Sequence, residues 1–163
     1  MGTPSVCEEF EHNGFIVDNK NPEAVVLTYD TTFNYQKWER AHTLLNNGAQ
    51  FIATHPDILC PVEEGFAPDL GCLLAAFKAG GHSNPTIIGK PYSTMIETLL
   101  EKLDIKAEEA VIIGDRLYTD IRLGVENKLP SILTLTGESQ LTDLLDSTWQ
   151  PSAIIHSVKN LIL

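Results

Sequence analysis

Apolar residues along the chain follow two alternating patterns. Short, continuous apolar and β-branched runs, typical of buried strands, occur at residues 24–29, 51–54, 86–89, 110–113, 131–135 and 153–155. Between them, apolar residues recur at helical spacing, which predicts helices over residues 35–46, 69–78, 93–103 and 119–127, and a short helix near Leu141. The repeated strand–helix–strand order predicts an α/β fold with parallel, helix-covered sheet.

The segment from Gly80 to Pro85 combines Gly, His, Ser, Asn and Pro, and it has the most linker-like composition in the chain. This segment separates two sets of strands and helices. We therefore expect two α/β lobes, one over residues 1–82 and one over residues 83–163.

Composition narrows the range of partners. The 163 residues include 11 Lys and Arg against 22 Asp and Glu, so the formal net charge is −11. Such a chain should repel nucleic-acid backbones and anionic membranes, and we expect neither as a partner. Cys7, Cys60 and Cys72 are widely spaced and form no metal or redox motif, which favours free thiols in a reducing, cytoplasmic compartment.

The strand over residues 110–113 leads into the most specific motif of the chain. It ends at Gly114-Asp115, and Asp120 follows at the start of a helix. Ligands of α/β sheets bind beyond the carboxyl ends of the strands, where Asp115 could offer a hard oxygen ligand to Mg²⁺. Asp120 could support such a site through water. On spacing alone, an ordinary turn acid and an acid in the first turn of a helix fit the pattern equally well.

Lys90 stands between Gly89 and Pro91 at the end of another strand. A lysine held there is a fixed point charge suited to phosphate, although an ordinary surface lysine can have the same local sequence. One amphipathic helix separates Lys90 from Asp115. In a strand–helix–strand crossover both strand ends face the same crevice, so we expect the two residues to lie near each other.

Several motifs, in matching order, resemble those of haloacid dehalogenase (HAD) superfamily phosphatases, and above all those of the NagD-like, 4-nitrophenylphosphatase-like branch. The carboxyl-terminal motifs are Gly89-Lys90-Pro91, residues 114–121 and Leu135-Thr136-Gly137, and the cap-like ones are residues 24–33, Asn47-Gly48-Ala49, residues 52–57 and Glu64-Gly65. The resemblance implies an α/β cap over residues 1–82. It implies the carboxyl-terminal part of a Rossmann-like HAD core over residues 83–163.

The resemblance also implies a Mg²⁺-dependent hydrolase that acts on a small phosphorylated metabolite. In the family, the lysine matched by Lys90 stabilises the nucleophile and the transferring phosphoryl group. The aspartate matched by Asp115 binds Mg²⁺, and Asp120 would support that site. A lysine and Mg²⁺ together suit phosphoryl transfer, because they stabilise the negative charge of its transition state.

Thr54, His55 and Asp57 follow a strand of the cap-like region, where we expect a pocket for the leaving group of the substrate. Relatives commonly carry Asn at the position of His55, so the resemblance does not extend their specificity to this chain. The alternative for His55 is a surface or capping histidine of a turn.

The family's nucleophile lies in an Asp-x-Asp motif, which does not occur in this chain. The nearest rival is Asp30, which ends an apolar strand, but that strand matches the cap better. We therefore expect the chain to be the carboxyl-terminal portion of a phosphatase, inactive by itself. The alternative is a non-catalytic α/β module that keeps the fold and weak Mg²⁺ or phosphate binding.

In the family's sheet, the strand over residues 110–113 neighbours the strand that carries the nucleophile. Without that neighbour, its apolar edge would be exposed, which is a pairing hazard. We expect the chain to form a homo-oligomer, to re-pair its own strands, or to pair with an amino-terminal segment of the parent protein.

Overall fold

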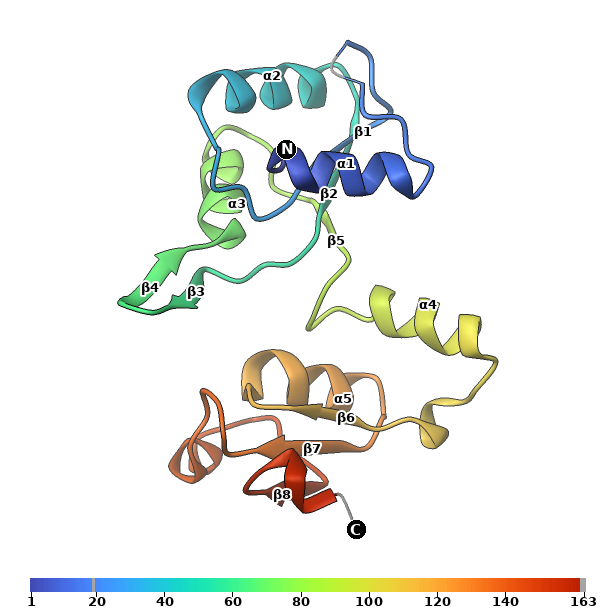
Figure 1. The fold of residues 1–163 in the computed structure, drawn as a ribbon, viewed down its shortest axis with the longest axis vertical. Coiled ribbons are helices and arrows are strands. Elements are labelled where there is room, and N and C mark those ends of the chain that lie inside the picture. Colours follow the sequence, from blue (N-terminus) through green and yellow to red (C-terminus); the bar gives the residue numbers. More distant parts are fainter. Residues whose placement is uncertain (19, 162–163) are drawn as a thin grey trace. The chain divides into compact units, whose positions relative to one another are not determined.

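The computed structural model describes residues 1–18 and 20–161. The chain divides into two compact units, Met1–Gly89 and Lys90–Leu163. Figure 1 shows the order of the elements along the chain, and each unit is described by itself below. Both units contain parallel sheet with helices, so the predicted α/β class is confirmed.

The first unit is built on a parallel sheet of three strands, in the order β1-β2-β5. Its strands are β1 (Ala24–Leu27), β2 (Gln50–Ala53) and β5 (Thr86–Ile87). Helices α2 (Tyr35–Asn46) and α3 (Leu70–Ala79) contribute to the same core as β1 and β2. That core contains the buried side chains Val25, Leu27, Ala41, Leu45, Ala53, Leu70 and Phe77. These strands and helices lie within about one residue of the predicted ranges for residues 35–46, 51–54 and 69–78.

Both helices of this core begin at side-chain caps. The Oδ1 atom of Asn34 accepts the N–H of Lys37 at 3.0 Å, and Oδ1 of Asp69 accepts the N–H of Leu70 at 2.6 Å. Such caps satisfy donors that have no partner within the first turn of a helix. α3 ends at Gly80, and the next residue, Gly81, has a φ of 100°, a left-handed value that favours glycine.

Two parts of the first unit are absent from the prediction. One is α1 (Pro4–His12), which begins after Thr3, and the other is an antiparallel hairpin of β3 (Leu59–Val62) and β4 (Gly65–Pro68). Thr3 caps α1 through a 3.4 Å contact from the N–H of Val6 to its hydroxyl. The structure therefore adds a helix and a hairpin to the expected strand–helix alternation.

The structure places the division between the units later than the expected boundary at residues 82 and 83. β5 pairs with β2, with Ala53 opposite Ile87, so it belongs to the sheet of the first unit. The compact units divide between Gly89 and Lys90. The linker-like composition from Gly80 to Pro85 marks the connection between α3 and β5, within the first unit.

The second unit has its own parallel sheet, in the order β6-β7-β8. Its strands are β6 (Ile112–Gly114), β7 (Ser131–Thr134) and β8 (Ala153–Ile155). Its helices are α4 (Thr94–Leu103) and α5 (Arg122–Glu126), and a single π-helical turn, Leu117–Ile121, precedes α5. Short 3₁₀ turns cover Ala107–Glu109, Leu141–Leu145 and Val158–Leu161. Ser93, at the start of the predicted helix over residues 93–103, is the residue that precedes α4, and its side chain makes no capping hydrogen bond.

The outer edge of β6 is open in the part of the chain that the structure describes. β6 pairs there with β7 alone. Val111, next to the strand, is 50% exposed, and Ile113 is 39% exposed. The expected exposed apolar edge is therefore present.

Two further observations concern the cysteines and the helices. Cys7, Cys60 and Cys72 are free thiols. Among the described residues, no helix has the length and apolar character needed to cross a membrane.

Candidate functional site

Lys90 and Asp120 form an ion pair in the second unit. The Nζ atom of Lys90 lies 2.5 Å from Oδ1 of Asp120, although the two residues are 30 positions apart. The side chain of Asp120 is 7% exposed, whereas that of Lys90 is 46% exposed. Oδ2 of Asp120 accepts the N–H of Arg116 at 3.2 Å. Both carboxylate oxygens of Asp120 are thus engaged, which offsets the cost of burying its charge.

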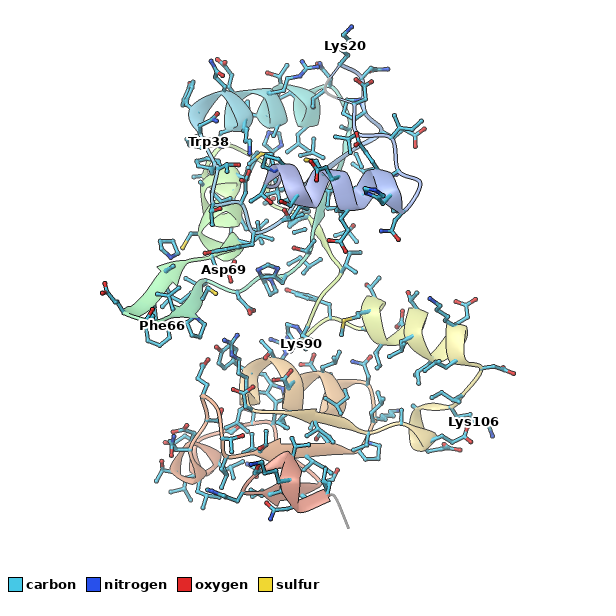
Figure 2. All side chains as sticks on the ribbon, viewed as in Figure 1. Lys20, Trp38, Phe66, Asp69, Lys90 and Lys106 are labelled. Atoms are coloured by element: carbon cyan, nitrogen blue, oxygen red, sulfur yellow. The ribbon has the colours of Figure 1, made fainter. Side chains whose placement is uncertain are left out.

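Asp115 follows β6 directly and lies five positions before Asp120 in the sequence. It is partly buried. Its Oδ2 atom accepts the N–H of Glu138 at 2.8 Å, and its carbonyl accepts the N–H of Ser139 at 3.0 Å. The loop after β7 therefore holds the loop after β6. The predicted residues Asp115 and Asp120 both lie at the carboxyl end of β6, and Asp120 brings Lys90 to the same end (Figure 2 labels Lys90).

Two glycines make this close approach possible. A Cβ atom added at Gly114 would overlap the side chain of Asp120, and one added at Gly137 would overlap that of Asp115. Neither glycine has a left-handed φ, so the requirement for glycine is one of space and not of backbone conformation. The cradle around the two aspartates is therefore built from backbone that carries no side chain.

Glu138 is a residue of this site that the sequence analysis did not single out. Its carboxylate lies 2.8 Å from Nε of Arg116 and accepts the hydroxyl of Tyr118 at 2.7 Å. Its own N–H binds Asp115. The available signal was its position immediately after the motif that ends in Gly137, but its partners lie about twenty residues earlier. Glu138 therefore connects Asp115, the candidate metal ligand, with Arg116 and Tyr118.

The chemistry of these residues fits a hard cation such as Mg²⁺. Asp115 supplies a carboxylate whose Oδ2 is fixed by Glu138, so Oδ1 is the oxygen that could face a cation. Asp120 would act through water or through its ion pair, since both of its oxygens are engaged. No group of three or more His, Cys, Asp or Glu residues that could hold a metal occurs within residues 1–18 and 20–161. The chain thus offers a partial ligand set, which is compatible with Mg²⁺ because this ion keeps several waters.

In the first unit, the predicted residues Thr54 and His55 form a chain of hydrogen bonds with Asp69. Oγ1 of Thr54 lies 2.9 Å from Nδ1 of His55, and Nε2 of His55 lies 2.9 Å from Oδ1 of Asp69. Asp69, labelled in Figure 2, caps α3 with the same oxygen. His55 therefore connects the end of β2 with the beginning of α3. Asp69 was predicted only as the start of a helix, and its contact with His55 was not foreseen.

Asp57, the third predicted residue of this region, approaches α3 through its backbone. Its carbonyl accepts the N–H of Gly71 at 2.7 Å, and a Cβ at Gly71 would overlap the carbonyls of Pro56 and Asp57. The structure therefore brings Thr54, His55 and Asp57 together at the carboxyl end of β2. All three belong to the first unit, whereas Lys90, Asp115 and Asp120 belong to the second.

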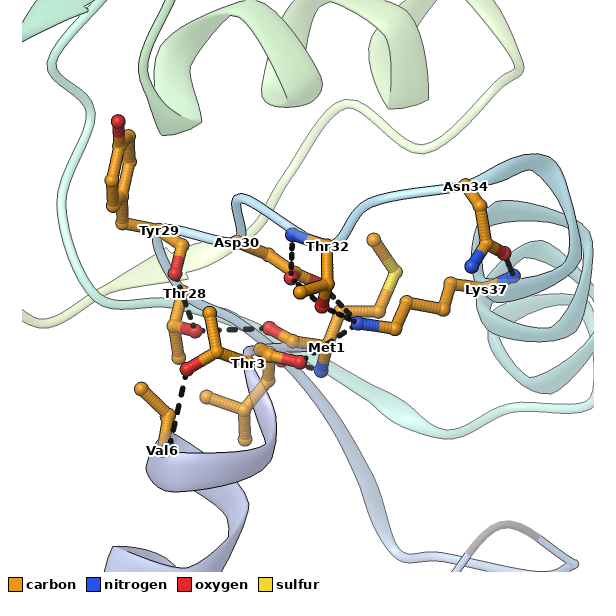
Figure 3. A network of polar contacts seen from close by, with 11 residues as sticks. Met1, Thr3, Val6, Thr28, Tyr29, Asp30, Thr32, Asn34 and Lys37 are labelled. Carbon is orange, nitrogen blue, oxygen red and sulfur yellow. Dashed lines mark hydrogen bonds and ion pairs between the residues drawn. The ribbon is translucent and has the colours of Figure 1, made fainter.

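Asp30, the rival for the role of nucleophile, is fully engaged in local contacts (Figure 3). Its oxygens accept the N–H of Thr32 at 2.9 Å and the hydroxyl of Thr32 at 2.6 Å, and they lie 2.7 Å from Nζ of Lys37. Lys37 also donates to the carbonyl of Gly2 at 2.9 Å. Burial alone would raise the pKa of Asp30, but the hydrogen bonds from Lys37 and Thr32 outweigh it and hold that pKa below its ordinary value.

Comparison with known proteins finds relatives of the chain among phosphatases. Residues 87–161 match the model of the HAD-hydrolase-like family. Over 158 residues the chain is 35% identical to ribonucleotide monophosphatase NagD of Escherichia coli, covering 97% of this chain and 62% of that protein. Over 161 residues it is 33% identical to dihydroxyacetone phosphatase of Corynebacterium glutamicum, covering 99% of this chain and 58% of that protein.

Solved structures give the same result. The crystal structure of 4-nitrophenylphosphatase from Thermotoga maritima matches with a TM-score of 0.91 and 40% identity, covering 98% of this chain and 62% of that one. NagD from E. coli matches with a TM-score of 0.85 and 34% identity, covering 96% of this chain and 62% of that one. The chain is homologous to the HAD-like hydrolases. It is similar to NagD and 4-nitrophenylphosphatase among them, and it spans about three fifths of the length of these relatives.

Proposed function

We propose that this chain is the carboxyl-terminal portion of a Mg²⁺-dependent phosphatase that hydrolyses a small phosphate ester. The observation that carries the proposal is the pairing of Lys90 with the buried Asp120 next to Asp115, inside a cradle formed by Gly114 and Gly137. The names of the relatives, a ribonucleotide monophosphatase and a dihydroxyacetone phosphatase, favour a small phosphorylated metabolite as substrate. In this proposal the first unit is the cap and the second is part of the core.

Each of the four site residues in the second unit has a separate role in the proposal. Lys90, held by Asp120, supplies a fixed positive charge for the oxygens of the transferring phosphoryl group. Asp115 would hold Mg²⁺, and Asp120 would support it through water. When bound, Mg²⁺ supplies charge neutralisation and orientation of the phosphoryl oxygens. Glu138 keeps Asp115 oriented through its N–H.

The first unit would contribute to substrate selection. Thr54, His55 and Asp57 gather at the carboxyl end of β2, where parallel sheets commonly bind ligands. Asp69 fixes the ring of His55 through Nε2, which leaves the orientation of the imidazole well defined. We propose that these residues contact the leaving group of the substrate.

The nucleophile is proposed to come from a segment that is not in this chain. Asp30 is an unsuitable nucleophile, because its carboxylate is buried and bonded to Thr32 and Lys37. The open edge of β6 is a place where a further strand could pair, from an amino-terminal segment of the parent or from a second copy of the chain. The three free thiols favour a reducing cytoplasmic compartment.

Hydrolysis of 4-nitrophenyl phosphate with Mg²⁺ tests the proposal. The chain alone should show no turnover above the buffer. If the coding sequence continues upstream in frame with an Asp-x-Asp motif, the longer product should be active. Lys90→Met and Asp115→Asn should each lower its turnover by about a hundredfold or more. Asp146→Asn, which changes an exposed acid outside the site, is the matched control.

Two results would change the proposal. Turnover by the chain alone that Asp30→Asn abolishes would assign the nucleophile to Asp30 and overturn the cap assignment. A longer product with an Asp-x-Asp motif that is inactive with Mg²⁺ would favour the alternative, a non-catalytic α/β module.

A further inference from the structure

The first unit contains a pair of histidines that the proposed function does not use. His42 lies on α2, and His82 follows the end of α3. Nε2 of His82 lies 3.0 Å from Nδ1 of His42, and the two rings are 4.7 Å apart between centroids, inclined by 73°. Each ring therefore turns one nitrogen toward the other.

This separation matches the spacing of two ligands on one metal ion. With a metal–nitrogen bond of about 2.1 Å, two imidazole nitrogens at a right angle on an octahedral ion are separated by about 3.0 Å. The 3.0 Å spacing of the histidines is the same, so the change from a hydrogen bond to shared ligation needs only small ring rotations. The proton between the rings would move to the far nitrogen of its own ring, so that both rings stay neutral.

The surroundings hold His82 in place. Its ring contacts Phe77 of α3 and Phe51 of β2, with centroid distances of 6.3 and 6.4 Å. The backbone N–H of His82 donates to the backbone carbonyl of Phe77 at 3.0 Å, across the turn at Gly81. The pair thus lies next to the carboxyl-terminal end of α3, where the helix dipole favours a cation.

We propose that Nδ1 of His42 and Nε2 of His82 together bind one divalent transition-metal ion that prefers imidazole, such as Ni²⁺ or Zn²⁺. Within the described residues no third protein ligand joins them, so water completes the coordination. Mg²⁺ prefers oxygen ligands and should not compete. This site shares no residue with the proposed phosphatase site, and its test does not depend on the proposed function.

Calorimetric titration of the chain with Ni²⁺ tests the site. Wild-type protein should bind Ni²⁺ in the presence of excess Mg²⁺. His42→Gln and His82→Gln should each weaken binding by at least about tenfold. His12→Gln, which changes an exposed histidine on α1, should bind as the wild type does, and weak binding by the thiols should be common to all variants.

Proton NMR of the histidine rings gives a second measurement that needs no variant. Paramagnetic Ni²⁺ should broaden the ring signals of His42 and His82 at lower concentrations than those of His12 and His156. Equal broadening of all four rings would overturn the proposal. So would Ni²⁺ affinities within twofold of the wild type in folded His42→Gln and His82→Gln proteins.

Discussion

Each unit of this chain buries an aspartate that pairs with a lysine, but the two pairs differ in what surrounds them. Asp30 binds Lys37 and Thr32, all within seven positions of one another, and its side chain is fully buried. Asp120 binds Lys90 from 30 positions away, and almost half of that lysine side chain faces solvent. Glycine backbone crowds Asp120, and a second loop reaches Asp115 beside it.

The comparison shows that burial and ion pairing do not by themselves indicate function. Both side-chain oxygens of Asp30 are engaged by Thr32 in the same loop and by Lys37 in the first turn of α2, which is an arrangement of a structural turn. The Lys90–Asp120 pair keeps a solvent-facing cation that a phosphate could reach. The exposure of the lysine, together with backbone that leaves room only for the aspartates, separates a candidate site from a structural contact.

The largest expected effect tests the glycine cradle of the second unit. Gly137→Ala and Gly114→Ala each place a methyl group inside an aspartate side chain, and each should destabilise the second unit by about 3 kcal/mol. The measurement is urea unfolding followed by Trp149 fluorescence, in a Trp38→Phe background, since these are the two tryptophans of the chain.

Gly80→Ala is the control for this test. Its φ is negative, and its Cβ would meet its nearest neighbours at 3.4 and 3.6 Å, which is ordinary contact. Its stability should change by no more than about 0.5 kcal/mol. A loss of the same size at Gly80 and Gly137 would show that the cradle is no tighter than an ordinary helix end.

The next prediction compares the two aspartates directly. Asp30→Asn should cost the first unit about 2 kcal/mol, because it leaves the partly buried ammonium of Lys37 with neutral acceptors only. Asp120→Asn should cost the second unit about 1 kcal/mol, because the more exposed Lys90 can turn to water. Urea unfolding with Trp38 and Trp149 as separate probes measures both. The reverse order would contradict the distinction between the two pairs.

Acid titration sharpens the same comparison. The lowered pKa of Asp30 means that the unfolded chain binds its proton more readily than the folded one. The stability that this group supplies is complete above the ordinary Asp pKa of about 4 and is lost as the pH falls through the lower folded pKa. The difference in unfolding free energy between wild type and Asp30→Asn should therefore shrink with acid below about pH 4. A difference that stays constant to pH 2 would remove the titrating role of Asp30.

The smallest expected change in stability concerns the open edge of β6. Ile113→Lys should alter unfolding by no more than about 0.5 kcal/mol, because Ile113 is already partly exposed, but it should reduce self-association. Light scattering over a concentration series measures this, with Leu145→Lys, at a more exposed position outside the sheets, as the control. A wild-type chain that is monomeric at every concentration and melts cooperatively would contradict the pairing hazard.

Elements with a strong apolar pattern could be predicted from the sequence, and those without one could not. Residues 35–46 form α2 as predicted, because Ala41 and Leu45 give the helix a buried face. α1 buries no residue fully, so it has no comparable stripe, although Thr3 and Pro4 are typical of a helix start. The hairpin of β3 and β4 was hidden by Pro61 and Pro68, which such a two-stranded ribbon tolerates.

In the candidate site, residues of local motifs could be predicted from the sequence, and contacts between distant residues could not. The motifs identified Lys90, Asp115 and Asp120, and Lys90 does contact Asp120. The expected strand–helix–strand crossover does not account for this contact, because β5 and β6 belong to different sheets. The roles of Glu138 and Asp69 depend on contacts over 23 and 14 positions, which no local pattern encodes. The compact units divide between Gly89 and Lys90 and not at residues 82 and 83, because the two-residue strand β5 pairs with β2 of the first unit.

The glycine cradle also restricts how this site can evolve. At Gly114 and Gly137, every single-residue change adds atoms where an aspartate already lies, so these positions offer no neutral steps. Sequence variation around the two aspartates would have to enter through exposed neighbours such as Tyr118 and Glu138. In a library of all single substitutions, positions 114 and 137 should therefore accept glycine alone. Positions 118 and 138 should accept many residues.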